Sequence, residues 1–113
     1  MNIAINKVGS VTIMELPGRA LDANNSRDFK AATNDLLKPG AKLVIDMGNL
    51  EFVDSTGLGA LVACLRHARG IQGEIKLCRL TKPVRSLFEL VRMHRVFDIF
   101  SNAEDAQKSY AMG

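Results

Sequence analysis

The sequence predicts an α/β fold: a small, mostly parallel sheet of four or five strands that opens with an N-terminal hairpin and is flanked by about four helices. Two observations support this prediction. Short apolar segments with strand composition alternate with longer segments in which apolar residues recur every three or four positions. Glycine, proline and capping residues stand at most of the boundaries between them. A chain of 113 residues is long enough for one hydrophobic core, so we expect a single domain over residues 1–113.

The first 40 residues predict a hairpin followed by a helix. Residues 3–8 and 11–16 have strand composition, and the pair Gly9-Ser10 between them suits a two-residue hairpin loop. Pro17-Gly18 ends the second strand. A helix is predicted next, with residue 24, 25 or 26 as its N-cap and residues 38–40 as its end. The side chains that this helix is expected to bury are Phe29, Ala32, Thr33 and Leu36.

The remaining segments continue the alternation. Residues 43–47 are nearly all apolar, which is typical of a central parallel strand, and residues 74–80 and 96–100 predict two further strands. Helices are predicted over residues 58–69, after Thr81 with Pro83 in the first turn, and after a capping box at residues 101–104. The apolar stripes expected on two of these helices are Leu58, Leu61, Val62 and Leu65, and Val84, Leu87, Phe88 and Val91.

Composition argues against several classes of protein. No run of about 18 apolar residues occurs and the first residues lack a signal pattern, so we expect a cytoplasmic protein with no membrane span. The net charge is only +3, with no Trp and one Tyr, which is not typical of a nucleic-acid-binding surface. Cys64 and Cys78 match no metal-ligand spacing and are expected to be reduced, structural thiols.

The segment Asp54-Ser55-Thr56-Gly57-Leu58-Gly59 is the most informative part of the chain. It lies between a predicted strand and a predicted helix, so a small hydroxyl side chain is expected at the N-terminal end of that helix. Free backbone N–H groups and the positive end of the helix dipole suit an anion or a phosphoryl group there. The two glycines would let another surface approach the backbone closely. Plain helix capping explains the first three residues equally well.

Enzymatic motifs fit this segment poorly. A dinucleotide fingerprint requires glycine where Val62 stands, a nucleophile elbow requires glycine where Val53 stands, and no lysine follows to make a P-loop. His67 should lie about 18 Å along the same helix from Ser55, at 1.5 Å per residue. A small serine hydrolase or nucleotide-binding enzyme is therefore the least favoured interpretation. Four carboxylates could bind a divalent cation, but they show no recurring metal-ligand spacing: Asp22, Asp46, Glu51 and Asp54. We therefore expect no catalytic residues, no metal and no cofactor.

Residues 52–59, preceded by Leu43-Val44-Ile45-Asp46, resemble the signature of bacterial anti-sigma factor antagonists, the single-domain STAS proteins. Three more segments extend the resemblance over essentially the whole chain. Residues 18–22 are similar to the G-x-L-D loop of these proteins, with one additional residue. Residues 73–80 resemble the strand that follows the signature, and residues 83–88 resemble the next helix. The resemblance implies the same small sheet flanked by helices.

The resemblance also implies a phosphorylation-controlled partner switch. Ser55 is the implied acceptor, with Thr56 as the alternative, and the donor is ATP held by an anti-sigma factor that is also a Ser/Thr kinase. The unphosphorylated antagonist binds this kinase, in its ATP- or ADP-bound form, and a PP2C-type phosphatase restores it after phosphorylation. The alternative function is a STAS regulator or scaffold with another client, in secretion, biofilm formation or lipid transport.

The resemblance also carries a set of partner-binding residues: Asp22, Asn24, Asp54, Thr56, Gly57 and Leu58. We expect them to form one patch with Ser55, because loops at the carboxyl ends of parallel strands gather at one edge of a sheet. An arginine in place of Gly57 is then expected to block docking of the partner while the fold persists.

Overall fold

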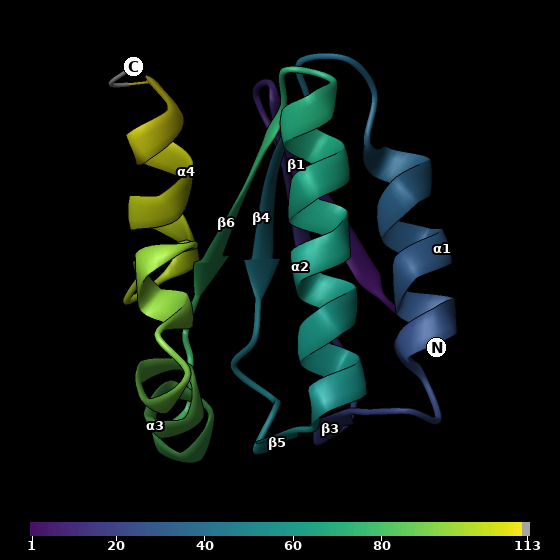
Figure 1. The fold of residues 1–113 in the computed structure, drawn as a ribbon. Coiled ribbons are helices and arrows are strands. Elements are labelled where there is room, and N and C mark those ends of the chain that lie inside the picture. The colour runs from purple at the N-terminus through teal and green to yellow at the C-terminus, as the bar shows by residue number, and fades with distance from the viewer. Residues whose placement is uncertain (112–113) are drawn as a thin grey trace.

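The computed structural model describes residues 1–111, which form a five-stranded mixed sheet with the order β1-β2-β4-β6-β7 (Figure 1). The strands are β1 (Ala4–Val8), β2 (Val11–Glu15), β4 (Lys42–Asp46), β6 (Glu74–Cys78) and β7 (Asp98–Phe100). β1 and β2 form an antiparallel hairpin, and every other neighbouring pair in this sheet is parallel. The predicted fold class is thus confirmed, including the N-terminal hairpin.

Helices cover both faces of the sheet. They are α1 (Ser26–Leu36), α2 (Ser55–Gly70), α3 (Lys82–Leu90) and α4 (Ala103–Ala111), with a short 3-10 helix, η1 (Met93–Arg95), after α3. Successive residues of a strand face opposite sides. Leu43 and Ile45 of β4 therefore join the core under α1 and α2, while Val44 packs with Ala106 of α4 on the other face. Among residues 1–111 no helix combines the length and the apolar character that a membrane span requires.

A second, very short sheet was not predicted from the sequence. It pairs β3 (Ala20–Leu21) with β5 (Phe52–Val53) in parallel. Strands of two residues are too short to show the alternation by which strands are recognised. This pair lies at the end of the molecule where α2 begins (Figure 1), and it joins the loop before α1 to the loop before α2.

Two helix starts differ from the predicted caps. Thr81 precedes α3 as predicted, but its hydroxyl donates to the carbonyl of Leu50 instead of to a helix N–H. The side chain of Asn102 accepts a hydrogen bond from the Asp105 N–H at 2.8 Å, so α4 is capped one residue later than the box predicted at residues 101–104. In the first case a distant carbonyl competes for the hydroxyl, and in the second an asparagine is at least as good a cap as serine.

Candidate functional site at the start of α2

The loops before α1 and α2 are bonded to each other through their backbones and one carboxylate. The Asp54 N–H donates to the carbonyl of Leu21 at 3.2 Å, and the Ala23 N–H donates to Oδ2 of Asp54 at 3.1 Å. Oδ1 of Asp22 accepts from the Asn24 N–H at 2.9 Å. These bonds bring Asp22, Asn24 and Asp54 to the same end of the molecule, next to the first turn of α2.

The loop before α1 is fixed by the side chain of Asn25. This residue occupies the N-cap position of α1 but makes no capping bond. Its Oδ1 instead accepts from the Asp22 N–H at 2.9 Å, and its Nδ2 donates to the carbonyl of Ala20 at 2.8 Å. Asn25 therefore bonds both Ala20 and Asp22 of the 18–22 loop, and it leaves the start of α1 without a side-chain cap.

Asp54 is the N-cap of α2. Its Oδ1 accepts from the Gly57 N–H at 2.8 Å while its Oδ2 holds Ala23 across the loop. The capping interpretation of the motif is therefore correct for this residue. It does not extend to the next one, because Ser55 is the first residue of the helix itself.

Ser55 and Thr56 are the exposed part of the motif. Within residues 1–111 their backbone N–H groups have no hydrogen-bond partner, and neither has the Ser55 hydroxyl. The first N–H groups of a helix have no intrahelical acceptor, and together with the dipole they favour negative charge. A phosphoryl group on Ser55 would therefore meet solvent and the positive end of α2, with no existing side-chain bond to break.

Gly57 has a structural role that the sequence analysis did not anticipate. It is buried, and a Cβ atom on it would lie 2.7 Å from the carbonyl carbon of Leu21 and closer still to the carbonyl oxygen. The surface that packs closely against this glycine is therefore the chain's own loop at Leu21, before α1. The expectation that an arginine here would leave the fold intact is therefore wrong. Gly59 is exposed, and a Cβ atom on it would meet nothing within 4 Å.

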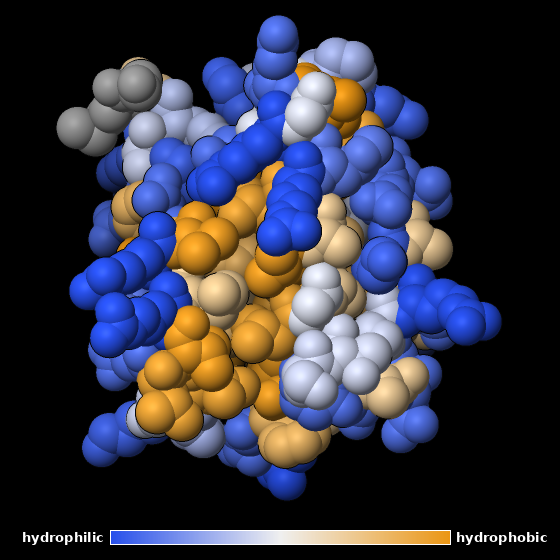
Figure 2. Space-filling model, in the orientation of Figure 1, coloured by the Kyte–Doolittle hydropathy of each residue, from blue (hydrophilic) through white to orange (hydrophobic). Residues whose placement is uncertain are grey.

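Apolar side chains are exposed on β5, directly before the motif, and on α3. Phe52 of β5 is 55% exposed and Leu90 of α3 is 81% exposed, while Leu58 is half-buried. Val91, which was predicted to lie in the buried stripe of α3, is 39% exposed. Figure 2 shows hydrophobic residues gathered on the face that carries α2 and α3, and α3 contacts β5. An exposed apolar surface of this kind is typical of a protein-binding site.

Neither Phe52 nor Leu90 was predicted from the sequence to lie on a binding surface. The available signal was the position of Leu90, which falls outside the stripe formed by Val84 and Phe88. A leucine on the polar side of an amphipathic helix is a candidate contact residue.

Asp46, one of the four carboxylates named above as possible cation ligands, is bonded to other groups of the protein. Its side chain is 7% exposed and pairs with Arg79, whose Nη1 donates to Oδ2 at 3.1 Å, while Oδ1 accepts from the Gly48 N–H at 2.9 Å. These bonds satisfy the carboxylate at the end of β4. Over the described residues, no three His, Cys, Asp or Glu side chains are grouped closely enough to hold a metal ion.

A family model described as the STAS domain matches residues 2–106 of the sequence. The chain belongs to the STAS domain family. This STAS domain is 26% identical over 110 residues to BtrV of Bordetella bronchiseptica, named as a candidate anti-sigma factor antagonist. The match covers 97% of this chain and 95% of that protein.

Solved structures show the same fold. An anti-sigma-factor antagonist (STAS) domain protein from Planctomyces limnophilus superposes with a TM-score of 0.87 at 18% identity, over 96% of this STAS domain and 97% of that chain. The Bacillus cell fate determinant SpoIIAA, in its phosphorylated form, superposes with a TM-score of 0.71 at 18% identity, over 96% and 99% of the two chains. Identities this low support conclusions about the fold alone.

Proposed function

We propose that this STAS domain is an anti-sigma factor antagonist in a partner-switching pathway. In the unphosphorylated form it binds an anti-sigma factor that is also a Ser/Thr kinase, and phosphorylation of Ser55 abolishes that binding. The observation that carries the proposal is the exposed Ser55 hydroxyl at the first residue of α2, which makes no hydrogen bond with any of residues 1–111. It lies between the exposed Phe52 and the half-buried Leu58. The names of BtrV and of the Planctomyces protein support the same role.

The charge of a phosphoryl group explains how one modification would prevent docking. Phosphoserine carries about −1.5 to −2 charges at neutral pH. In a complex that covers Phe52 and Leu58, this charge would lie beside Asp54 and would lose its hydration. An unpaired buried charge costs several kcal/mol, which corresponds to about 10²- to 10³-fold in affinity.

The same modification is expected to leave the free domain folded. The Ser55 hydroxyl makes no hydrogen bond within residues 1–111, and the cap of α2 is supplied by Asp54. The helix N-terminus stabilises a nearby negative charge by about 0.3–1 kcal/mol. Phosphorylation would therefore remove one contact with the partner without unfolding the protein, as a reversible switch requires.

The nucleotide and the catalytic groups belong to the partner in this proposal. The chain lacks the glycine-rich and lysine-containing motifs of nucleotide-binding enzymes, so ATP or ADP would be held by the kinase. A PP2C-type phosphatase would return Ser55 to its unmodified state. The binding surface is proposed to consist of Ser55 and the exposed or half-buried residues around it: Asp22, Asn24, Asp54, Thr56 and Leu58. Gly57, which is buried against the loop at Leu21, would support this surface from beneath.

The acceptor can be identified with a matched pair of variants, Ser55→Ala and Thr56→Ala. The kinase for this test is an anti-sigma factor kinase recovered from the native cell with the wild-type chain. After incubation with this kinase and ATP, mass spectrometry is expected to find one phosphate on the wild type and on Thr56→Ala, and none on Ser55→Ala. Phosphate on Thr56 alone, or incorporation without the kinase, would contradict the assignment.

The effect of charge on docking can be separated from that of shape. Ser55→Asp and Ser55→Asn introduce side chains of nearly equal size, and only the first is charged. By titration calorimetry against the same kinase, Ser55→Ala and Ser55→Asn are expected to bind like the wild type. Ser55→Asp should bind about tenfold or more weakly, although one carboxylate carries less charge than a phosphate. Equal affinity of phosphorylated and unmodified protein would instead indicate a scaffold that binds its client constitutively.

A further inference from the structure

β1 forms one edge of the five-stranded sheet, and within residues 1–111 no strand pairs with its outer side. All five of its residues are exposed, whereas β7, at the opposite edge, has three residues of which two are half-buried. Proteins usually protect a long edge strand with proline, a bulge or several charges. β1 has no proline, its pairing with β2 is uninterrupted, and Lys7 is its only charged residue.

Exposed apolar side chains are concentrated at this edge. Of the six large apolar residues that are exposed within residues 1–111, three belong to the first eight: Met1, Ile5 and Val8. The other three lie on β5 and at the end of α3, next to the proposed binding surface. Ile5 is 51% exposed and Val8 is 40% exposed. The edge at β1 is therefore a second apolar surface, which the proposed function does not use.

The backbone groups of Ile5 and Lys7 point away from β2. Val8 and Val11 flank the two-residue loop Gly9-Ser10, which makes them a hydrogen-bonded pair. Bonded and unbonded pairs alternate along an antiparallel ladder. Every second residue from Val8 backwards is therefore bonded to β2, and the residues between them, Ile5 and Lys7, present their N–H and C=O groups at the outer side of the sheet.

The exposed apolar side chains of β1 lie on both faces of the sheet. Ile5 pairs with Met14, which belongs to the core under α1 and α2, and Val8 pairs with Val11, which belongs to the cluster beneath α4. Residues directly opposite each other in an antiparallel pair point to the same face. Both hydrophobic clusters therefore continue to the edge of the sheet, where a further strand would cover them.

We propose that β1 pairs with β1 of a second copy of this chain, antiparallel and centred on Asn6, so that the two sheets become one continuous sheet. In this register Ile5 lies opposite Lys7 of the second copy, and the outer N–H and C=O groups of these residues bond to each other. Val8 lies opposite Ala4 of the second copy. The arrangement has a two-fold axis, so it closes at the dimer.

The residues of β1 favour this partner and this register. The aliphatic part of Lys7 covers Ile5 of the second copy while its ammonium group stays in water. A pair centred on Lys7 would set two like charges directly opposite each other, which is unfavourable. A pair centred on Ile5 would need Ile3 as a strand residue, but Ile3 lies outside β1 and packs against the core.

Sedimentation equilibrium of the full chain tests the dimer. A contact between two edge strands buries a small area, so we expect weak association, with a Kd of about 10–100 µM, measured over protein concentrations of about 5–500 µM. Leu90→Gln removes an equally exposed kind of side chain at the other apolar surface, and this control should dimerise like the wild type. A wild type that stays monomeric throughout would overturn the proposal and leave the edge to a strand of another protein.

The register is tested by three variants of one exposed residue: Ile5→Glu, Ile5→Gln and Ile5→Lys. All three lose the same apolar side chain, and they differ in the charge that faces Lys7 of the second copy. Dimer affinity should fall in the order in which they are named, by about tenfold between the first and the last. Circular dichroism checks that each variant is folded. Equal affinity of Ile5→Glu and Ile5→Lys, or loss of the dimer in Leu90→Gln, would contradict the proposed pairing.

Discussion

Gly57 and Gly59 stand two positions apart in α2, and their surroundings differ sharply. A Cβ atom on Gly57 would press against the backbone carbonyl of Leu21, which cannot move without separating the two loops of the site. We expect Gly57→Ala to lower the free energy of unfolding by about 1–3 kcal/mol, as overpacking of a tight contact does. Gly59→Ala meets open space and should raise it by about 0.5–1 kcal/mol, because alanine is the better helix former.

Urea denaturation followed by circular dichroism measures both effects, provided that the dependence of the unfolding free energy on urea stays the same. A Gly57→Ala protein as stable as the wild type would show that α2 and Leu21 are not in tight contact. If Gly57→Ala lowers the free energy of unfolding and Gly59→Ala raises it, close packing decides the effect at Gly57 and helix propensity decides it at Gly59.

Asp54 and Ser55 are adjacent, and this structure gives them different uses as experimental probes. The Asp54 carboxylate holds both the start of α2 and the loop at Ala23. Any substitution of Asp54 therefore alters the fold and the proposed interface together. The Ser55 side chain makes no bond within the described residues, so variants at this position report on docking alone.

At the scale of secondary-structure elements, α3 ends in an unusual way. Arg92 follows the last residues of this helix in the left-handed conformation, with φ of 61°, at a position that glycine usually occupies. Arg92→Gly should raise the free energy of unfolding by up to about 1 kcal/mol, because a side chain in this conformation is strained. Glu89→Gly, inside the same helix, is the matched control and should lower it by about 0.8–1 kcal/mol relative to alanine.

Thermal denaturation of the two variants beside the wild type and Glu89→Ala provides the comparison. The Arg92→Gly change acts on an exposed turn, so the near-ultraviolet spectrum of the core should stay the same. A loss of stability in Arg92→Gly would mean that the arginine side chain makes a contribution larger than the strain of its backbone.

At the scale of the whole molecule, the two cysteines report on the two faces of the sheet. Cys64 is buried in the core under α1 and α2, and Cys78 is buried beneath α4. Burial raises the pKa of Cys64 to about 11 and that of Cys78 to about 12, from an ordinary value of 9.0. The repulsion of Asp46 adds to the rise at Cys78.

These pKa shifts predict a loss of stability in alkali. A group whose folded pKa is raised stabilises the protein fully below its unfolded pKa, here 9.0, and the stabilisation is lost as the pH rises through the folded value. Urea denaturation at pH 8, 9 and 10 should therefore give a falling free energy of unfolding. In the double variant Cys64→Ala/Cys78→Ala the fall should be smaller, whatever its stability at pH 8. An equally steep fall in that variant would assign the effect to other groups.

Local patterns in the sequence determined much of this fold. The hairpin at Gly9-Ser10, the buried strand β4 and the stripes of the helices are signals between residues at most a few positions apart, which repeat every 2 or 3.6 residues. The combination of Asp54 with two small hydroxyl residues indicated a helix start in the same way, and the structure has α2 begin at Ser55. Such signals are readable because both partners lie in one element.

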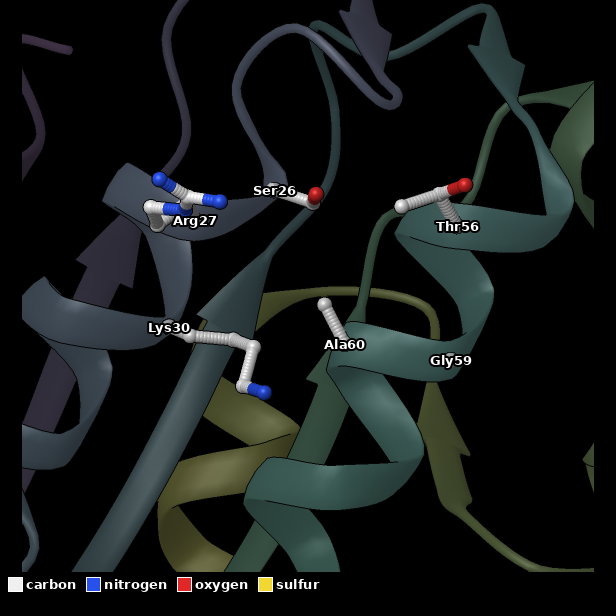
Figure 3. Close-up of a pocket in the computed structure, with 6 residues that line it drawn as sticks. All are labelled: Ser26, Arg27, Lys30, Thr56, Gly59 and Ala60. Atoms are coloured by element: carbon white, nitrogen blue, oxygen red, sulfur yellow. The ribbon is translucent and has the colours of Figure 1, made fainter.

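Contacts between distant residues were decided only by the tertiary structure. The neighbour of Gly57 is Leu21, the partner of the Thr81 hydroxyl is the Leu50 carbonyl, and β3 pairs with β5, each across about 30 or more residues. A hollow of about 340 Å³ between α1 and α2 likewise exists only because two helices from different parts of the chain begin side by side (Figure 3). No local periodicity encodes these pairs, because they depend on how whole elements pack, and packing is fixed by the complete core.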